Sequence, residues 1–159
     1  MASTHKRVIV RKFDRDTLQG YVAPGALAAN GRIEVLNTAG KVVSLEPRDV
    51  KGVYFVRDFN DSGDLARKTF SSRPRTEGLW IRAKFLDNDV LEGMIPADLN
   101  LQTAEGYMVT PPDTRGNTQR IFIPRTALSE LTVLGVIGGP QGRRRRPSAD
   151  AAQVPMFSE

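Results

Sequence analysis

The chain has 159 residues, of which 40% are hydrophobic and 26% are charged, values that suit one medium or two small folded domains. It contains no cysteine, which excludes disulfides, thiolate zinc sites and thiol nucleophiles. The single histidine is His5, so a histidine metal site or a Ser-His-Asp triad is not expected. We find no apolar run of ~18 residues and no secretion signal, and therefore expect a cytoplasmic protein without cofactor or metal.

The formal net charge of +5 is distributed unevenly along the chain. Residues 1–76 carry 14 Lys and Arg against 8 Asp and Glu, whereas residues 77–140 carry 5 against 8. Residues 141–159 carry 4 against 2. The basic and acidic parts could attract each other, within one chain or between copies, or the basic part could form one face that binds polyanions.

The first half of the chain predicts short strands separated by turns, because apolar and β-branched residues alternate with turn-forming ones. The predicted strands cover residues 8–13, 18–22, 32–36, 41–45 and 53–56. Gly20 lies inside the second strand, and such a glycine usually marks a bulge or bend that lets a small sheet curl. Pro47-Arg48 predicts a single helical turn before the last strand. No segment shows the 3.6-residue apolar periodicity of a long helix.

Three motifs recur in the same order in the second half: a Lys-Phe pair before an Asp-rich turn, a Leu-(Gln/Glu)-Gly segment, and a Pro-Arg pair before the last strand. They lie at Lys12-Phe13, Leu18-Gln19-Gly20 and Pro47-Arg48, and again at Lys84-Phe85, Leu91-Glu92-Gly93 and Pro124-Arg125. This alignment places one extra residue in the second Asp-rich turn. We therefore predict a mainly β chain of two tandem small β-barrels, with a first barrel at 6–57, a connecting segment at 58–78, a second barrel at 79–138 and a disordered basic tail at 139–159.

Five short strands with one helical turn before the fifth are the plan of SH3-like and Sm-like barrels, and the sequence resembles Sm-like proteins. The segments that carry the resemblance are Leu18-x-Gly20-x-Val22, Leu91-x-Gly93-x-Ile95 and Asp98-Leu99-Asn100-Leu101, the last being similar to the Asp-x-x-Asn region of that superfamily. The first copy has no such Asp, and the second Sm signature is missing from both copies. The two-copy layout also resembles an uncharacterised bacterial domain family, which implies no particular function.

The connecting segment is long for a simple link between two compact units. Its composition is polar and turn-like, with a few large apolar side chains. We expect it to pack across the barrels through Phe59, Leu65 and Phe70.

The tail contains four consecutive arginines, which could neutralise phosphates and give salt-sensitive affinity for nucleic acid. A tail this short supplies about 4 of the roughly 6–10 contacts typical of such binders, so a solvated tail is the alternative interpretation. Basic residues of the connecting segment would extend the patch if they face the same way. The candidate polyanion-binding residues are Arg67, Lys68, Arg73, Arg75, Arg143, Arg144, Arg145 and Arg146.

A second candidate site resembles the arginine and Asp/Asn-x-Ser-x-x-Gly elements of PilZ-type cyclic-dinucleotide receptors. Its residues are Arg11, Arg15, Asn60 and Ser62. Leu65 takes the place of the expected glycine, and Arg11 lies inside a strand rather than on an arm. Surface salt bridges to the neighbouring aspartates are the alternative account of the two arginines.

The sequence contains no GxSxG, P-loop or GxGxxG motif, and its paired aspartates lie at hairpin tips where water would level their pKa values. We therefore predict that the protein is not an enzyme. Small barrels with exposed edge strands pair readily with partner strands or with copies of themselves. The first hypothesis is a binding or scaffolding protein that acts through protein–protein interaction or self-association. RNA or DNA binding and cyclic-dinucleotide binding are the alternatives.

Overall fold

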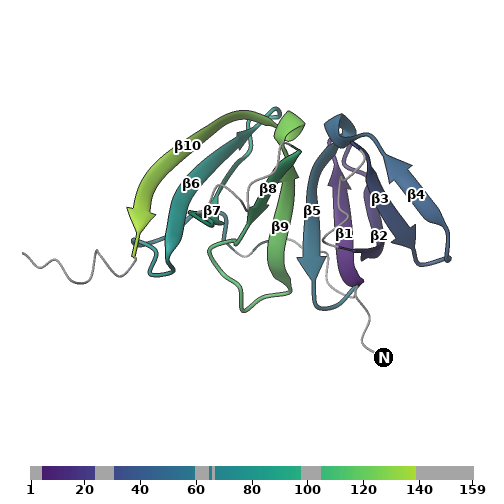
Figure 1. Cartoon of the computed structure of the whole chain (residues 1–159), viewed down its shortest axis with the longest axis horizontal. Coiled ribbons are helices and arrows are strands. Elements are labelled where there is room, and N and C mark those ends of the chain that lie inside the picture. The colour runs from purple at the N-terminus through teal and green to yellow at the C-terminus, as the bar shows by residue number, and fades with distance from the viewer. Residues whose placement is uncertain (1–4, 24–30, 60–64, 66, 98–104, 139–159) are drawn as a thin grey trace, which may run out of the picture.

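The computed structural model describes residues 5–23, 31–59, 65, 67–97 and 105–138. The first half forms β1 (Lys6–Lys12), β2 (Thr17–Val22), β3 (Ile33–Asn37), β4 (Val42–Leu45), the 3-10 turn η2 (Pro47–Asp49) and β5 (Val50–Val56). The second half follows the same order with β6 (Gly78–Phe85), β7 (Val90–Ile95), β8 (Gly106–Val109), β9 (Thr118–Pro124), η4 (Arg125–Ala127) and β10 (Leu128–Ile137). The prediction of a mainly β chain is confirmed (Figure 1).

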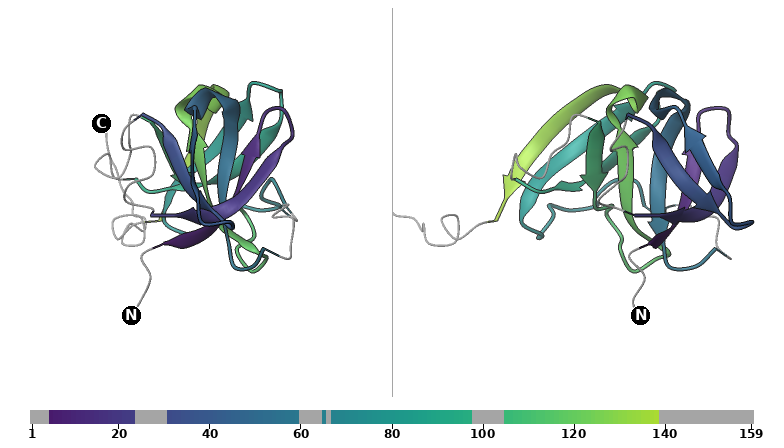
Figure 2. Two further views of the ribbon diagram at one scale, coloured as in Figure 1. Left: turned by 90° about the vertical axis from the view of Figure 1, so that its right-hand side faces the viewer. Right: turned by 45° about the vertical axis from the view of Figure 1, so that its right-hand side comes forward.

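The strands form two antiparallel sheets. The larger sheet has seven strands in the order β4-β3-β2-β1-β5-β9-β8, and the smaller has three in the order β10-β6-β7. A bridge between Met94 of β7 and Thr110 links the two sheets, with both backbone N–H···O distances at 2.9 Å. Strands β5 and β9 lie side by side at the centre of the molecule, whereas β4 and β10 lie at its opposite ends (Figures 1 and 2).

No closed barrel occurs among the described strands, because the strand that would close each half pairs elsewhere. Closing the first half would require β4 to pair with β5. Instead β5 pairs with β9 of the second half, with Tyr54 opposite Ile121. The larger sheet thus crosses the predicted boundary, and two separate SH3/Sm-like barrels are not confirmed. The division at 6–57, 58–78 and 79–138 stays a prediction, and the predicted disordered tail at 139–159 lies outside the described residues.

The internal repeat is visible in the hairpin turns of the two halves. The backbone N–H of Lys12 donates to the carbonyl of Asp16 at 3.0 Å, and that of Phe85 donates to Asp89 at 2.8 Å. Lys12 therefore corresponds to Phe85 rather than to Lys84, and the two turns have equal length. The predicted extra turn residue is wrong, because the alignment matched side-chain types whereas backbone hydrogen bonds set the strand register.

The glycine of the second strand is also equivalent in the two halves. A Cβ atom at Gly20 would lie 2.5 Å from the carbonyl oxygen of Leu36, and one at Gly93 would lie 2.8 Å from that of Thr110. Any larger residue would clash with the backbone of β3 in the first half and with the residue that follows β8 in the second. The glycines predicted to bend the sheet therefore allow the second and third strands to approach closely.

Strands β5 and β10 are equivalent as well. Each pairs with the first strand of its own half, and each pair has a register irregularity near its start. Phe55 of β5 lies opposite Val8, and Val133 of β10 lies opposite Ile81. Because Val8 and Ile81 are each paired with the strand glycine of their half, Val133 is the counterpart of Phe55.

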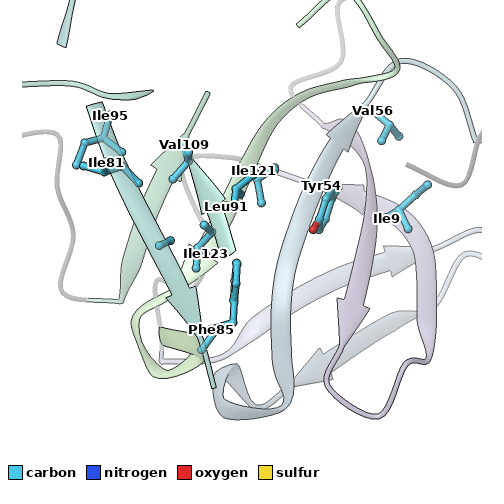
Figure 3. Close-up of a cluster of buried hydrophobic side chains, with 12 residues drawn as sticks. Ile9, Tyr54, Val56, Ile81, Phe85, Leu91, Ile95, Val109, Ile121 and Ile123 are labelled. Atoms are coloured by element: carbon cyan, nitrogen blue, oxygen red, sulfur yellow. The ribbon is translucent and has the colours of Figure 1, made fainter. Parts of the chain in front are cut away.

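The two halves share a hydrophobic core. One cluster is formed almost wholly by the first half and comprises Val8, Val10, Val22, Ile33, Val35, Val50, Val53, Phe55 and Phe122. The other combines second-half residues with Ile9, Tyr54 and Val56 from β1 and β5 (Figure 3). Successive side chains of a strand point to opposite faces, so the central strand β5 contributes to both clusters. Burial on both faces explains why β5 is apolar along most of its length.

The connecting segment packs on the sheets through the three side chains expected from the sequence. Phe59 and Leu65 lie against the shared core. The ring of Phe70 packs edge-on against Trp80, with 6.1 Å between the ring centroids. The buried carboxylate of Glu92 accepts hydrogen bonds from the Trp80 Nε1–H at 3.3 Å and from the Phe70 backbone N–H at 3.0 Å. These contacts hold the segment against both sheets, since Phe59 also packs edge-on against Tyr21 of β2.

Candidate binding surfaces

The structure brings together three of the eight predicted polyanion-binding residues. Arg67, Arg73 and Arg75 line a shallow hollow of about 320 Å³. Lys68 points elsewhere, because its ammonium group pairs with Asp89 at 2.8 Å. The remaining four, Arg143, Arg144, Arg145 and Arg146, lie outside the described residues.

The predicted cyclic-dinucleotide residues are only partly placed. Arg11 and Arg15 line a hollow of about 530 Å³ near the hairpin turns. The guanidinium of Arg11 lies over the ring of Tyr54 at 5.1 Å from its centroid, and Arg15 takes the left-handed backbone position of the turn with φ 75°. Asn60 and Ser62 lie outside the described residues, so this site stays a prediction.

An ion-pair network in the same hollow connects the two halves. The ammonium of Lys51 on β5 lies 2.9 Å from a carboxylate oxygen of both Asp87 and Asp89 in the β6–β7 turn. Lys68 approaches Asp89 from the connecting segment. The prediction that water levels the turn aspartates is wrong for this pair, because the tertiary fold brings two lysines to it.

The network shifts the pKa values of its members. Partial burial would raise the pKa of Asp89, but hydrogen bonds from Lys68 and Lys51 outweigh it and lower that pKa to about 2. Burial is the largest single effect on the pKa of Asp87 and raises it, but the hydrogen bonds from Lys51 and from the Asp89 backbone, together with the positive charge of Lys51, lower that pKa overall. Burial lowers the pKa of Lys51, and its bonds to Asp89 and Asp87 more than reverse this effect. These opposed charges stabilise the junction between the halves.

A groove of about 700 Å³ gathers basic residues that are far apart in the sequence; we call it the basic groove. Among the residues that the structure describes, its lining contains no carboxylate and comprises His5, Lys6, Arg7, Tyr21, Phe55, Val56, Arg57, Gln119 and Arg120. The cations come from the start of β1, the end of β5 and the start of β9, which the sheet order brings together. Sequence reasoning missed this groove, since its only local signal was the Lys6-Arg7 pair.

Some arginines of the basic groove also support the fold. The Arg7 guanidinium donates to the carbonyl of Arg57 at 2.9 Å, and the Arg57 guanidinium donates to that of Thr114 at 3.1 Å. Arg120 lies over the ring of Phe55 at 5.5 Å from its centroid. Each guanidinium has five N–H donors, so these contacts leave N–H groups that can bind other acceptors.

Strands β4 and β10 form the outer edges of the molecule, since each pairs with one neighbour among the described strands. Four large apolar residues of the described ranges are strongly exposed, and three of them lie on these two strands: Val42 on β4 is 67% exposed, and Val133 and Val136 on β10 are 54% and 65% exposed. The fourth, Leu86, lies in the β6–β7 turn. Apolar side chains on an unpaired edge are a template for another strand, and native proteins commonly avoid them.

Within the part of the chain that the structure describes, no group of three or more His, Asp or Glu residues is arranged to hold a metal ion. No described helix is long and apolar enough to cross a membrane.

The fold and its surfaces define a β-sheet protein of two repeated halves with a basic groove and two apolar outer edges. The chain belongs to a family of unknown function, DUF6982, whose model matches residues 4–135. The prediction of an uncharacterised domain family is thereby confirmed, and the match takes in both halves. No curated protein and no solved structure matches the chain.

Proposed function

We propose that the protein is a non-enzymatic scaffold that joins other protein strands to its outer edges, β4 and β10. The observation that carries this proposal is the exposure of Val42, Val133 and Val136 on those edges. An edge strand offers a row of backbone donors and acceptors, and apolar side chains beside it add contact area when a partner strand binds.

The strand order supports an SH3/Sm-like relationship for each half as part of this proposal. In the first half the order β5-β1-β2-β3-β4, with a one-turn helix before β5, is that of an Sm-like unit left open at one seam. The second half follows the same order if the Met94–Thr110 bridge is taken as the link between β7 and β8. An open seam leaves edges for partners, which a closed barrel would not.

The proposal is tested by comparing the proteins that co-purify with the full chain and with edge variants from cells that produce it. Val42→Lys and Val133→Lys place a charge on each edge and should remove bound partners, because a charged edge strand resists pairing. Leu86→Lys is the matched control, since Leu86 is similarly exposed but lies off both edges. Retention of the same partners by both edge variants would contradict the proposal.

A second candidate function, binding of RNA or DNA, is favoured by the basic groove. Five of the described residues that line it are basic and none is a carboxylate, an arrangement that attracts phosphates. Phe55 is buried and Tyr21 packs edge-on against Phe59, so the two rings support the groove walls rather than base stacking. We expect such binding to be insensitive to base sequence.

This second function predicts a gel shift with a 30-nucleotide single strand at about 50 mM salt that disappears as salt rises. Lys6→Gln together with Arg120→Gln should weaken it, whereas Arg48→Gln, an exposed arginine outside the groove lining, should not. Equal weakening by all the variants, or no shift with either RNA or DNA, would remove this candidate.

A further inference from the structure

The internal junction shows how a fourth strand and a fifth strand of this repeat bind each other. β9 is the fourth strand of the second half and β5 is the fifth strand of the first, and they pair with Phe55 opposite Arg120. The same two roles are left at the outer edges: β4 is the fourth strand of the first half, and β10 is the fifth strand of the second. The two outer edges therefore offer the same combination, a fourth strand and a fifth strand, that pairs at the internal junction.

The exposed valines occupy the junction positions of these two strands. Val133 is the counterpart of Phe55, as their registers against β1 and β6 show. Val42 is the counterpart of Arg120. Leu36 lies opposite Val42, and Thr110 takes the place of Leu36 beside the strand glycine. The pairing of Val109 with Ile121 places Arg120 opposite Thr110. Phe55 is 3% exposed where β9 covers it, whereas Val133 is 54% exposed where no described strand does.

The hydrogen-bonding groups of β4 are directed outward at the required positions. Asn37 donates its N–H to the carbonyl of Lys41 at 2.8 Å, so this pair faces inward across the β3–β4 hairpin. Backbone groups alternate in direction along an antiparallel strand. The N–H and C=O groups of Val42 and Ser44 therefore point away from β3, toward any strand added at this edge. The Ser44 carbonyl also accepts a long bond of 3.4 Å from the Arg32 guanidinium, which an added strand would displace.

The same holds for β10. The Phe85 N–H points into the β6–β7 hairpin, so by alternation Arg82 of β6 faces β10 and the opposite residue, Thr132, faces β6. The backbone groups of Val133 then point outward. The register is irregular just after Val133, and beyond this point the backbone groups of Val136 again point outward. The Val136 carbonyl accepts a hydrogen bond from Arg73 of the connecting segment at 3.3 Å.

We propose that β10 of one copy pairs antiparallel with β4 of a second copy in the register of the β5–β9 junction, so that Val133 lies opposite Val42. This inference rests on the proposed function and names its partner as a second copy of the chain. The contact is heterologous, so a pair of copies keeps one open β4 edge and one open β10 edge, and the assembly grows head to tail into a ring or a filament. Pairing would bury both exposed valines against each other.

The contact between copies is weaker than the internal junction. Tyr54 and Ile9 place apolar side chains into the shared core, but their counterparts are Thr132 and Arg82. Lys51, which pairs with the turn aspartates across the junction, has Ser129 as its counterpart. The association between copies is therefore reversible and depends on protein concentration.

The absence of cysteine allows a direct test by disulfide cross-linking of full-length variants. Residues directly opposite in such a hydrogen-bonded pair lie about 5.5 Å apart at Cα, within disulfide range. Purified Val42→Cys and Val133→Cys are mixed under oxidising conditions and should form a mixed disulfide dimer, with little homodimer of either. The double variant should form a ladder of oligomers. Val133→Cys mixed with Leu86→Cys is the control for random collision.

Sedimentation velocity over a range of concentrations gives the second measurement. Wild type should associate as concentration rises, and Val42→Lys or Val133→Lys should weaken association by roughly tenfold or more, because a charged edge resists pairing. Melting curves check that these exposed substitutions leave the fold intact. Either of two results would overturn the inference. The wild-type protein would stay monomeric at all concentrations, or the mixed disulfide would form no faster than in the Leu86→Cys control.

The remaining outcomes separate the inference from the proposed function. Homodimers of Val42→Cys that form as fast as the mixed dimer would indicate pairing of like edges and would overturn the proposed register. A monomeric purified protein whose lysine variants still lose a co-purifying partner would overturn the inference and leave the proposed function standing. Self-association that neither lysine variant weakens would overturn the inference, because copies would bind through another surface. Retention of the co-purifying partners by both lysine variants would overturn the proposed function.

Discussion

The β5–β9 junction and the outer edge at β10 place equivalent strands in different surroundings. At the junction, β5 has a neighbour on each side, and its residues Phe55 and Tyr54 are buried in two different clusters. At the outer edge, β10 has one neighbour among the described strands, and Val133 is exposed. The same strand role thus accepts an aromatic residue where it is covered and a smaller apolar residue where it is open. The comparison shows that neighbours, rather than the repeat itself, decide which positions form the core.

The largest expected effect is the difference between Phe55→Ala and Val133→Ala. Truncating the buried phenylalanine should lower the free energy of unfolding by about 3–5 kcal/mol, since a cavity forms beneath Arg120. The equivalent change at the exposed valine should cost no more than about 0.5 kcal/mol in the monomer. Urea unfolding at low protein concentration measures both. Similar costs at the two positions would mean that the junction does not cover Phe55.

The next effect concerns a feature that the two halves share. Gly20→Ala and Gly93→Ala each place a methyl group against the backbone of β3 or of the residue that follows β8, and each should cost about 1–3 kcal/mol. Gly116→Ala is the control, because a Cβ there has no atom within 4 Å. Thermal unfolding compares the three variants. A cost at only one of the two strand glycines would show that the halves are not equivalent at this point.

A smaller effect is expected from Lys51→Met, which removes the ion pairs that the junction has and the outer edge lacks. The variant should lose about 1 kcal/mol of unfolding free energy at pH 7, because the pairs are partly exposed. Lys41→Met, in the exposed β3–β4 turn, should change it little.

The effect of Lys51→Met should also depend on pH. The pKa of Asp89 is lowered to about 2 in the folded protein, so its stabilising contribution is full above the unfolded pKa of ~3.9. It is lost as pH falls from about 4 through about 2. The gap between wild type and variant should therefore narrow over that range in acid titrations of unfolding free energy. A gap that stays constant down to pH 2 would mean that the lysine acts through its contact with the Phe85 ring instead.

Much of the local structure was predictable, because it depends on neighbours in sequence. The turn aspartates, the strand glycines and the Pro-Arg turns predicted the succession of strands and turns along each half. The predicted alignment of the second copy on the first was wrong by one position at the hairpin turn. Lys84-Phe85 matches Lys12-Phe13 in residue type, but the backbone hydrogen bonds pair Phe85 with the place of Lys12. Of the candidate polyanion residues, Lys68 was diverted to Asp89 by a contact that no local pattern encodes.

The basic groove and the Lys51 network could not be predicted in the same way. Both depend on which strand lies beside β5, and β9 is separated from it by more than half of the second repeat. The apolar character of β5 on both faces was the available signal, since a strand buried on two sides must have two covering layers. That signal does not say which strand provides the second cover.

The sequence by itself determined a mainly β chain of two related halves, the position of their turns and the glycines at which their strands approach. These features follow from short-range preferences of the backbone, which neighbouring residues set. Only the tertiary structure decided that β5 pairs with β9, that basic residues from three strands meet in one groove, and that Val42 and Val133 remain on open edges. Strand pairing between distant segments depends on the shared burial of both partners, and this burial is a property of the folded chain as a whole.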